Sequence, residues 1–272
     1  MDLPYLWKPY GNGELTVLSP LPGLGEIKVR GRRPSLPAGQ RLYAVGDIHG
    51  RLDLLDELLA RIDADIALRP TPKPRYVFLG DYIDRGPSSR ETIDRLIEHG
   101  ATHESVFLKG NHELIAIKCL SDRSLFDQWL RLGGLETLVS YGLPPETLAN
   151  GKQIAEIQSA FHHALPQTHF RFFRDLKNSF ECGDFFFAHA GVKPGVELSQ
   201  QKESDLLWIR GEFLSSDDDF GKIIIHGHTP TREIEVGANR INIDTGAFAT
   251  GRLTCLVLEG ESLSVIDTSA GS

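Results

Sequence analysis

Residues 41–50, RLYAVGDIHG, join a short β-prone run to a polar turn that lies between two glycines. The same arrangement returns at residues 75–86, RYVFLGDYIDRG, and a similar one with a single glycine at residues 105–113, SVFLKGNHE. A helical pattern follows each of these three segments, as expected when strands and helices alternate. The polar residues therefore stand where the strands of an open α/β sheet pass into loops, and ligand sites collect at such positions.

The order of elements from residue 41 onward predicts a layered α/β architecture. After the first motif, apolar residues recur at helical spacing and predict a long helix: Leu52, Leu55, Leu58, Leu59, Ile62 and Ile66. From about residue 114 to residue 180 the pattern stays helical, which we interpret as a helical insertion packed beside the sheet. Five later runs read as strands, with no helical pattern between most of them: residues 185–188, 223–225, 240–243, 253–258 and 263–266. We expect these runs to form a second, largely antiparallel sheet.

Residues 1–40 differ in composition from the rest of the chain, with six prolines and six glycines and no sustained period. We interpret them as an extension outside the core fold. Residues 14–18 and 26–29 could pair as a small hairpin that lies on the main domain. A surface arm is one role for this extension, and a lid or dimer contact through Tyr5, Trp7 and Tyr10 is the other.

The overall composition excludes several classes of protein. The net charge of −8 argues against nucleic acid as a partner, because binding its backbone requires a basic surface. No stretch approaches the roughly 20 apolar residues that a membrane span needs, so we expect no membrane partner and a cytoplasmic location. The three cysteines are widely spaced, which suits buried free thiols better than disulfides or a zinc site. The oligomeric state stays open.

Residues with metal-binding side chains stand at the ends of the predicted strands. Residues two apart point the same way in a strand-to-loop segment, so Asp47 and His49 can bind one ion together. Asp81 follows the neighbouring strand at the same level, and its two carboxylate oxygens can bridge two ions. An asparagine after the third strand and two histidines from the second half of the chain complete the predicted ligands: Asp47, His49, Asp81, Asn111, His189 and His228. His226 is the rival of His228, and we assign it a structural role or a role beside the ligands.

These six ligands offer oxygen and nitrogen atoms and no sulfur. Such a set suits two divalent ions such as Mn²⁺, Fe or Zn²⁺ and not a structural zinc site built from cysteines. Two ions about 3.5–4 Å apart would lower the pKa of a bridging water and hold both oxygens of an in-line displacement. We therefore expect phosphoester hydrolysis by direct attack of a hydroxide bound to both metals.

Four further residues complete the predicted chemistry. His112 is adjacent to the ligand Asn111 but is not itself a predicted ligand, so it is free to protonate the leaving alkoxide as a general acid. Asp84 could accept a hydrogen bond from His112, which would fix its tautomer and favour the imidazolium. Arg85 and Arg210, together with Asn111, are candidates to bind the substrate phosphate. A surface salt bridge is the alternative role for Arg210.

The motifs resemble those of the phosphoprotein phosphatase family of calcineurin-like metallophosphoesterases, and within it the bacterial and phage serine/threonine phosphatases. Five family motifs are matched in order by these segments: residues 46–50, 80–86, 110–113, 189–191 and 226–229. The resemblance covers about residues 41–260 and implies a four-layer α/β/β/α sandwich of two mixed sheets with a small helical insertion. It implies two metal ions, commonly Mn²⁺, and hydrolysis of phosphomonoesters without a phosphoenzyme. Residues 41–268 would then be the catalytic domain.

The resemblance leaves several functions open. Symmetrical dinucleoside tetraphosphate hydrolases share the metal motifs but usually lack the Asp-Arg pair after the bridging aspartate, so Asp84 and Arg85 favour a phosphatase without excluding the nucleotide. Phosphodiesterase activity is a further alternative, because the same ions can activate water against a diester. A binding module that kept the fold is the non-enzymatic alternative, but no ligand is lost and His112 is present. We expect a Mn²⁺-dependent phosphatase whose partners are proteins that carry phosphoserine or phosphothreonine.

Overall fold

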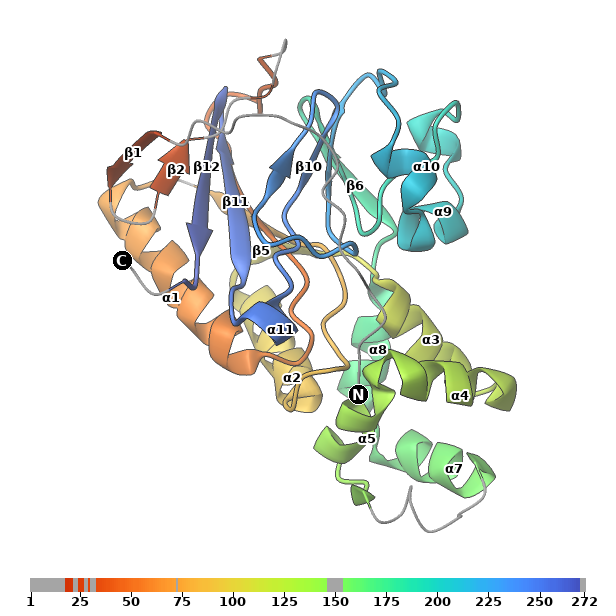
Figure 1. Ribbon diagram of the computed structural model, residues 1–272. Helices are drawn as coiled ribbons and strands as arrows, with labels where there is room; N and C mark the ends of the chain where they lie inside the picture. Colours follow the sequence, from red (N-terminus) through yellow and green to blue (C-terminus); the bar gives the residue numbers. More distant parts are fainter. Residues whose placement is uncertain are drawn as a thin grey trace.

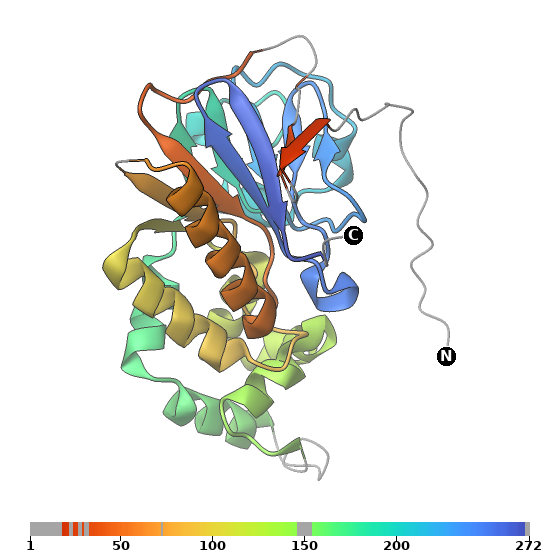
Figure 2. The same cartoon turned by 90° about the vertical axis from the view of Figure 1, so that its left-hand side faces the viewer.

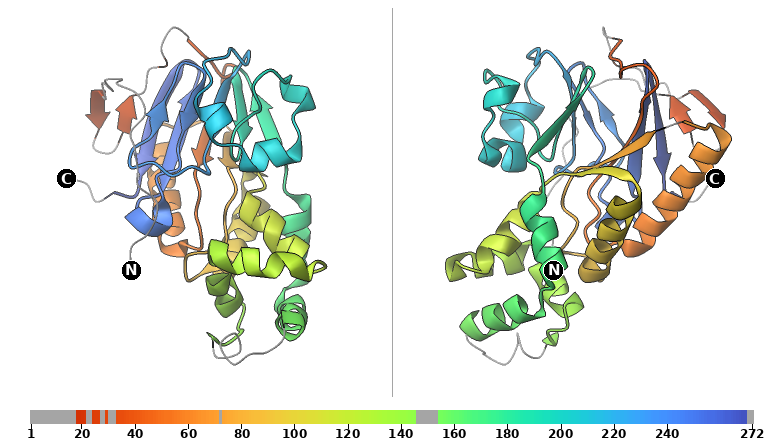
Figure 3. Two further views of the ribbon diagram at one scale, coloured as in Figure 1. Left: turned by 45° about the vertical axis from the view of Figure 1, so that its right-hand side comes forward. Right: turned by 180° about the vertical axis from the view of Figure 1, so that it is seen from behind.

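Two β-sheets lie face to face in the computed structural model, and helices cover their outer faces (Figure 1). The structure describes these parts of the chain: residues 18–21, 24–26, 29, 33–71, 73–145 and 154–269. α1 (Leu52–Leu68) and α2 (Ser89–Thr102) lie against the first sheet, and Figure 2 shows both in front of it. α9 (Glu203–Trp208) and α10 (Gly211–Leu214) lie on the far side of the second sheet (Figure 3). The four-layer α/β/β/α sandwich is therefore confirmed.

The first sheet contains the three strands that carry the motifs. Its seven strands, in the order β1-β2-β12-β11-β3-β4-β5, have these bounds: β1 Leu18–Leu21, β2 Leu24–Glu26, β12 Ser262–Asp267, β11 Thr254–Glu259, β3 Arg41–Val45, β4 Pro74–Phe78 and β5 Glu104–Phe107. β3, β4 and β5 pair in parallel, with Val45 opposite Phe78 and Phe78 opposite Phe107. The carboxyl ends of these three strands therefore lie next to one another, and the motif residues follow directly after them.

A hairpin from the N-terminal extension adds β1 and β2 to this sheet, on the side opposite to β5. β1 pairs antiparallel with β2, and β2 pairs antiparallel with β12. The sequence predicted a hairpin here, but its strands are shifted from residues 14–18 and 26–29, and Pro20 lies within β1. Proline has no N–H to donate and is tolerated on an edge strand, which is the position of β1. The predicted lid or dimer contact through Tyr5, Trp7 and Tyr10 lies outside the described residues.

The second sheet corrects one prediction from the sequence. Its five strands, in the order β6-β7-β8-β10-β9, have these bounds: β6 Ser179–Cys182, β7 Phe185–Ala188, β8 Ile223–His226, β10 Arg240–Asn242 and β9 Glu235–Val236. The expectation of a largely antiparallel sheet was wrong, because β7, β8 and β10 run parallel. The helices α9 and α10 form the crossover that brings β8 back parallel to β7. The last two predicted strands, β11 and β12, instead belong to the first sheet.

The helical segment lies beside one end of the sheets (Figures 1 and 3). Its α-helices have these bounds: α3 Asn111–Cys119, α4 Phe126–Trp129, α5 Leu135–Ser140, α7 Ile154–Ala164 and α8 Gln167–Asp175. A π-helical turn, η2 (Leu130–Gly134), joins α4 to α5, and short 3-10 turns occupy Arg123–Leu125 and Leu198–Gln200. Of the helices in the described part of the chain, none has the length and apolarity that a membrane span requires.

The apolar core fixes the strands from both faces. In β3, Leu42 and Ala44 face the second sheet and pack in the cluster that includes Phe187 and Ile225. The alternating residues Tyr43 and Val45 pack on the other face, in the cluster that contains the buried residues of α1. Both faces of β3 are therefore buried, one against the second sheet and the other against α1. The strand ends that carry the polar motifs are therefore anchored in a close-packed interior.

Candidate active site

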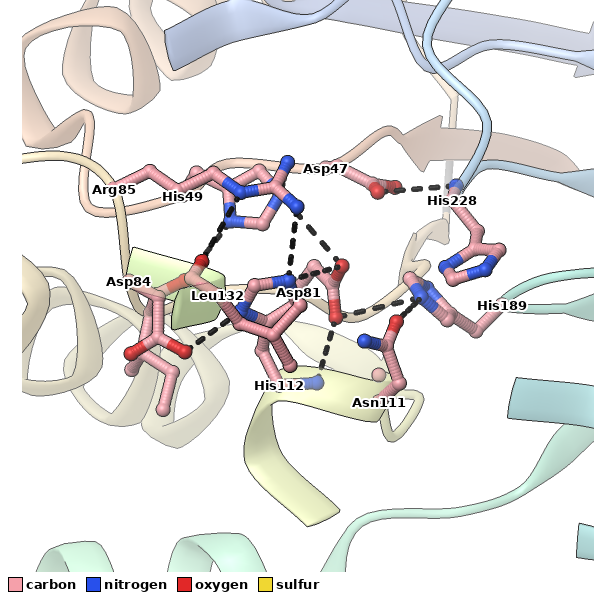
Figure 4. Close-up of polar contacts among 12 residues, drawn as sticks. Asp47, His49, Asp81, Asp84, Arg85, Asn111, His112, Leu132, His189 and His228 are labelled. Atoms are coloured by element: carbon pink, nitrogen blue, oxygen red, sulfur yellow. Dashed lines mark hydrogen bonds and ion pairs between the residues drawn. The ribbon is translucent and has the colours of Figure 1, made fainter. Parts of the chain in front are cut away.

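The six predicted metal ligands converge at the ends of strands from both sheets (Figure 4). They come from the following positions: Asp47 and His49 after β3, Asp81 after β4, Asn111 at the start of α3, His189 after β7 and His228 after β8. Each of these residues is at most 5% exposed. Polar side chains at this depth need partners, so their convergence indicates a site built for a polar ligand.

Left-handed backbone conformations concentrate at this site. Among the described residues other than glycine, those with positive φ all belong to the predicted site: His49, Asp81, Asp84, Arg85 and His228. Such a conformation costs about 1–3 kcal/mol for each residue and persists only where the surroundings enforce it. The carbonyl oxygen of Asp81, for example, accepts hydrogen bonds from the backbone N–H groups of Ile48 at 3.1 Å and His49 at 2.8 Å. These contacts hold the first two motif loops together.

Side-chain atoms that can bind a metal form two overlapping groups, one of which contains His112, the predicted acid, and not Asp47. His49, Asp81 and His112 make one group, and Asp81, His189 and His228 make the other, with the ligand atoms of each within 4.8 Å of one another. Asp81 is common to both groups, which is the position that a bridging carboxylate requires. The structure thus offers two adjacent positions for cations around Asp81.

The residues present fit metal ions. Asp47 Oδ1 and His228 Nε2 are buried and have no hydrogen-bond partner, which is costly unless a ligand satisfies them. His49 Nδ1 lies 2.9 Å from the carbonyl oxygen of Ile83, and His189 Nδ1 lies 3.0 Å from that of Leu79. When Nδ1 donates its proton to a carbonyl, the lone pair of Nε2 is left for a metal.

The charges of the site also suit cations. Burial and the nearby carboxylates of Asp244 and Asp81 raise the pKa of Asp47 well above its usual value. Burial opposes the ionisation of Asp81 too, but the surrounding histidines outweigh it and hold the pKa of Asp81 well below the usual value. Burial lowers the pKa of His228 to about 2, so its imidazole is neutral and able to act as a ligand. A neutral histidine beside buried carboxylates is a combination that a divalent ion would stabilise.

Asp84 and His112 lie in direct contact. Asp84 Oδ2 is 2.6 Å from His112 Nδ1, and the same carboxylate accepts hydrogen bonds from Trp129 Nε1 at 3.0 Å and Thr137 Oγ1 at 2.6 Å. Burial disfavours the imidazolium of His112, but the charge of Asp81 and the hydrogen bond to Asp84 outweigh burial and raise the pKa of His112. His112 Nε2 lies 3.7 Å from Asp81 Oδ2, so this nitrogen faces the centre of the site.

The two predicted phosphate-binding arginines lie in different environments. Arg85 directs Nη1 toward His49 Nε2 at 3.1 Å and Nη2 toward His112 Nε2 at 3.2 Å. Arg210 is exposed and donates a hydrogen bond to Thr229 Oγ1 at 3.4 Å. Desolvation of its guanidinium by the surrounding protein lowers the pKa of Arg210, and the carboxylate of Asp81 acts against this change. Both guanidinium groups are therefore close enough to influence an anion in the site.

His226 lies away from the ligand groups. Its ring contacts that of Phe213, with 5.0 Å between the centroids, and its Nδ1 lies 3.1 Å from the carbonyl oxygen of Gly227. Burial lowers the pKa of His226 to about 3. The structure therefore places His228, rather than His226, beside Asp81 and His189.

The sequence reasoning missed Glu113. Its carboxylate accepts hydrogen bonds from the backbone N–H groups of Asp81 at 2.9 Å, Tyr82 at 2.7 Å and Gly110 at 2.9 Å, and so links the second and third motifs. The position of Glu113 at the end of GNHE, directly after the predicted acid, was the available signal. Asp244, which is buried beside Asp47, was missed as well, and burial raises its pKa to about 6. Asp244 follows β10 in the segment IDTG, residues 243–246, which is not one of the motifs predicted from the sequence.

Comparisons with known proteins agree with this geometry. The model of the calcineurin-like phosphoesterase family matches residues 40–245. A bis(5'-nucleosyl)-tetraphosphatase PrpE [asymmetrical] of Anoxybacillus flavithermus is 29% identical over 82% of this chain and 93% of its own length. The serine/threonine-protein phosphatase 2 of Escherichia coli is 29% identical over 79% of this chain and 91% of its own length.

Solved structures show the same fold. A cold-active protein-tyrosine phosphatase of a psychrophilic Shewanella species superposes with a TM-score of 0.53 at 15% identity, over 95% of this chain and 86% of its own. Because the family model covers about three quarters of the sequence and the ligand groups fit two cations, the chain belongs to the calcineurin-like phosphoesterase family of hydrolases.

Proposed function

We propose that this protein is a phosphomonoesterase that removes phosphate from serine and threonine side chains of proteins. The observation that carries the proposal is the buried contact between His112 and Asp84, with the other ring nitrogen of His112 facing the shared ligand Asp81. Serine and threonine leave as alkoxides, which are strong bases, so their departure needs a proton donor. The raised pKa of His112 favours its protonated form, which can supply that proton.

We infer that the six converging side chains hold two divalent ions, with Asp81 shared between them. Such ions would supply the positive charge that activates water for attack and neutralises the phosphate oxygens. The protein's own contribution is to fix the ligands. The carbonyl groups of Ile83 and Leu79 orient His49 and His189, and Glu113 holds the backbone of Asp81. Orientation of this kind commonly decides metal affinity and activity.

Asp84 prepares His112 for proton transfer. Its carboxylate is held by Trp129 and Thr137, so it cannot turn away from His112 Nδ1. It keeps that nitrogen protonated, which leaves the proton on Nε2 available to the leaving oxygen. Arg85 and Arg210 would bind the remaining phosphate oxygens with their planar donors, and Asn111 would contribute its amide.

A second candidate function is hydrolysis of a dinucleoside tetraphosphate. It is favoured by the PrpE relatives, whose name describes an asymmetrical bis(5'-nucleosyl)-tetraphosphatase. The leaving group in that reaction is a nucleotide phosphate, which is far more stable as an anion than an alkoxide. A buried acid such as His112 would therefore contribute little to that reaction, and this difference favours the phosphomonoester.

The test compares kcat/KM of the Mn²⁺-loaded protein on a phosphothreonine peptide and on diadenosine tetraphosphate, with metal-stripped protein as control. We expect the peptide to be the better substrate and the stripped protein to be inactive. A higher kcat/KM on the dinucleotide would move the function to nucleotide hydrolysis. Activity on neither substrate would refute both candidates.

A further inference from the structure

Phe248 is an exposed aromatic residue that touches the site without belonging to any motif. It lies on the short helix α11 (Ala247–Thr250) and is 37% exposed, although a large apolar side chain gains by burial. Its ring centroid is 5.4 Å from that of His49, and Arg85 Cζ lies 4.7 Å from the ring centroid. An aromatic ring at this distance attracts a guanidinium cation through its negative face.

The short helix that carries Phe248 is held in place by the residues around it. Glycines with left-handed φ angles of 68° and 73°, Gly246 and Gly251, flank α11 and turn the chain sharply at both ends. Ala247 is buried, and its carbonyl oxygen accepts a hydrogen bond from Arg51 Nη1 at 3.0 Å. Arg51 is itself held by two hydrogen bonds to Asp53, at 2.8 and 2.6 Å. Phe248 is thus presented by a rigid element.

Arg85 needs such a support. Its backbone N–H donates to the carbonyl oxygen of Gly133 at 3.0 Å and its Nε to that of Leu132 at 3.4 Å, but its side chain is long, and fixing its rotamers costs entropy. Arg85 Cζ lies over the ring of Phe248, while both terminal nitrogens are directed toward His49 and His112. These nitrogens are the donors that a phosphate in the site would meet.

We propose that Phe248 is a positioning residue for phosphate binding, which holds the guanidinium of Arg85 at the angle from which both terminal nitrogens reach the phosphate. The inference rests on the role proposed above for Arg85. Phe248 acts through the aromatic face and not through its volume, so leucine, which is apolar but has no π-system, cannot replace it. Tyrosine keeps the aromatic face and can therefore replace Phe248.

The test measures the Kd of inorganic phosphate for the Mn²⁺-loaded protein by calorimetry, which requires no turnover. We expect Phe248→Leu to raise this Kd about two- to fivefold, the change that an exposed cation–π contact supports. Phe248→Tyr should restore the affinity of the original protein. In an Arg85→Gln background, Phe248→Leu should have no further effect, because the two residues act as a pair.

Phe170→Leu is the matched control, because Phe170 is also 37% exposed but lies on α8. It should leave the Kd unchanged, and the thermal midpoint of each variant verifies folding. An unchanged Kd in Phe248→Leu, or an equal loss with and without Arg85, would overturn the inference. If phosphate binds as expected but no phosphorylated peptide is hydrolysed, the proposed function fails while the role of Phe248 stands.

Discussion

The substitution Gly133→Ala should displace Arg85 by a distance that follows from the structure. It lies in η2 with φ of 106°, and a Cβ added there would lie 2.7 Å from Arg85 Cγ and 2.8 Å from the backbone nitrogen of Arg85. Non-bonded heavy atoms settle at about 3.5 Å, so Gly133→Ala has to displace the backbone of Arg85 by about 0.7 Å. A misplacement of about 1 Å can cost about 100-fold in rate. We therefore expect kcat/KM to fall about tenfold or more while the metals remain bound.

Gly142 provides the control for this experiment. Its φ is 88°, and a Cβ added there would have no atom within 4 Å, so Gly142→Ala carries the backbone cost of about 1–2 kcal/mol without touching Arg85. Both variants are assayed at full metal loading on a phosphorylated peptide, and their thermal midpoints are compared. If Gly133→Ala is folded and matches Gly142→Ala in kcat/KM, the reasoning about Arg85 is refuted.

Three further predictions concern the acid, the shared ligand and the effect of pH on stability. His112→Asn should keep its metals and lower kcat about 10²–10⁴-fold on a phosphothreonine peptide, but far less on an aryl phosphate whose leaving group needs no proton. Steady-state kinetics on both substrates decide this, and an equal loss on both would contradict the assignment. Asp81→Asn should lose both bound metal, as counted by elemental analysis, and activity, whereas two retained ions would contradict its shared role. Burial, with the charges of His103 and Arg95, lowers the pKa of His99 to about 4. The neutral His99 therefore contributes its full stability above the unfolded pKa of about 6.5, and this contribution is lost as the pH falls toward 4. Urea unfolding at pH 7 and pH 5 should therefore show a smaller loss of stability in His99→Gln than in the original protein, and an equal loss would refute the assignment.

The sequence predicted the parts of the structure that local patterns encode. The strand at residues 41–45 was located correctly because an apolar run ends there at a glycine motif, and the alternation of strands and helices after it was visible in their periods. The second sheet was mispredicted because its crossover helices, α9 and α10, have six and four residues and are too short to show a helical period.

Long-range contacts account for what the sequence could not show at the site. Asp84 meets Trp129 and Thr137 across 45 and 53 residues of chain, and no motif connects them. Phe248 likewise reaches Arg85 only because α11 folds back over the first motif loop. Motif spacing could indicate which residues meet a ligand, whereas the residues that hold them in place are set by tertiary packing.

The central claim is that this chain hydrolyses phosphoesters with two ions held around Asp81. The most direct measurement adds Mn²⁺ back to metal-stripped protein and follows, in the same samples, the number of ions bound per chain and the phosphate released from a phosphothreonine peptide. We predict no release without metal and a rate that rises until two ions are bound per chain. Full activity in the stripped protein, or a rate that reaches its maximum at one ion per chain, would contradict the claim.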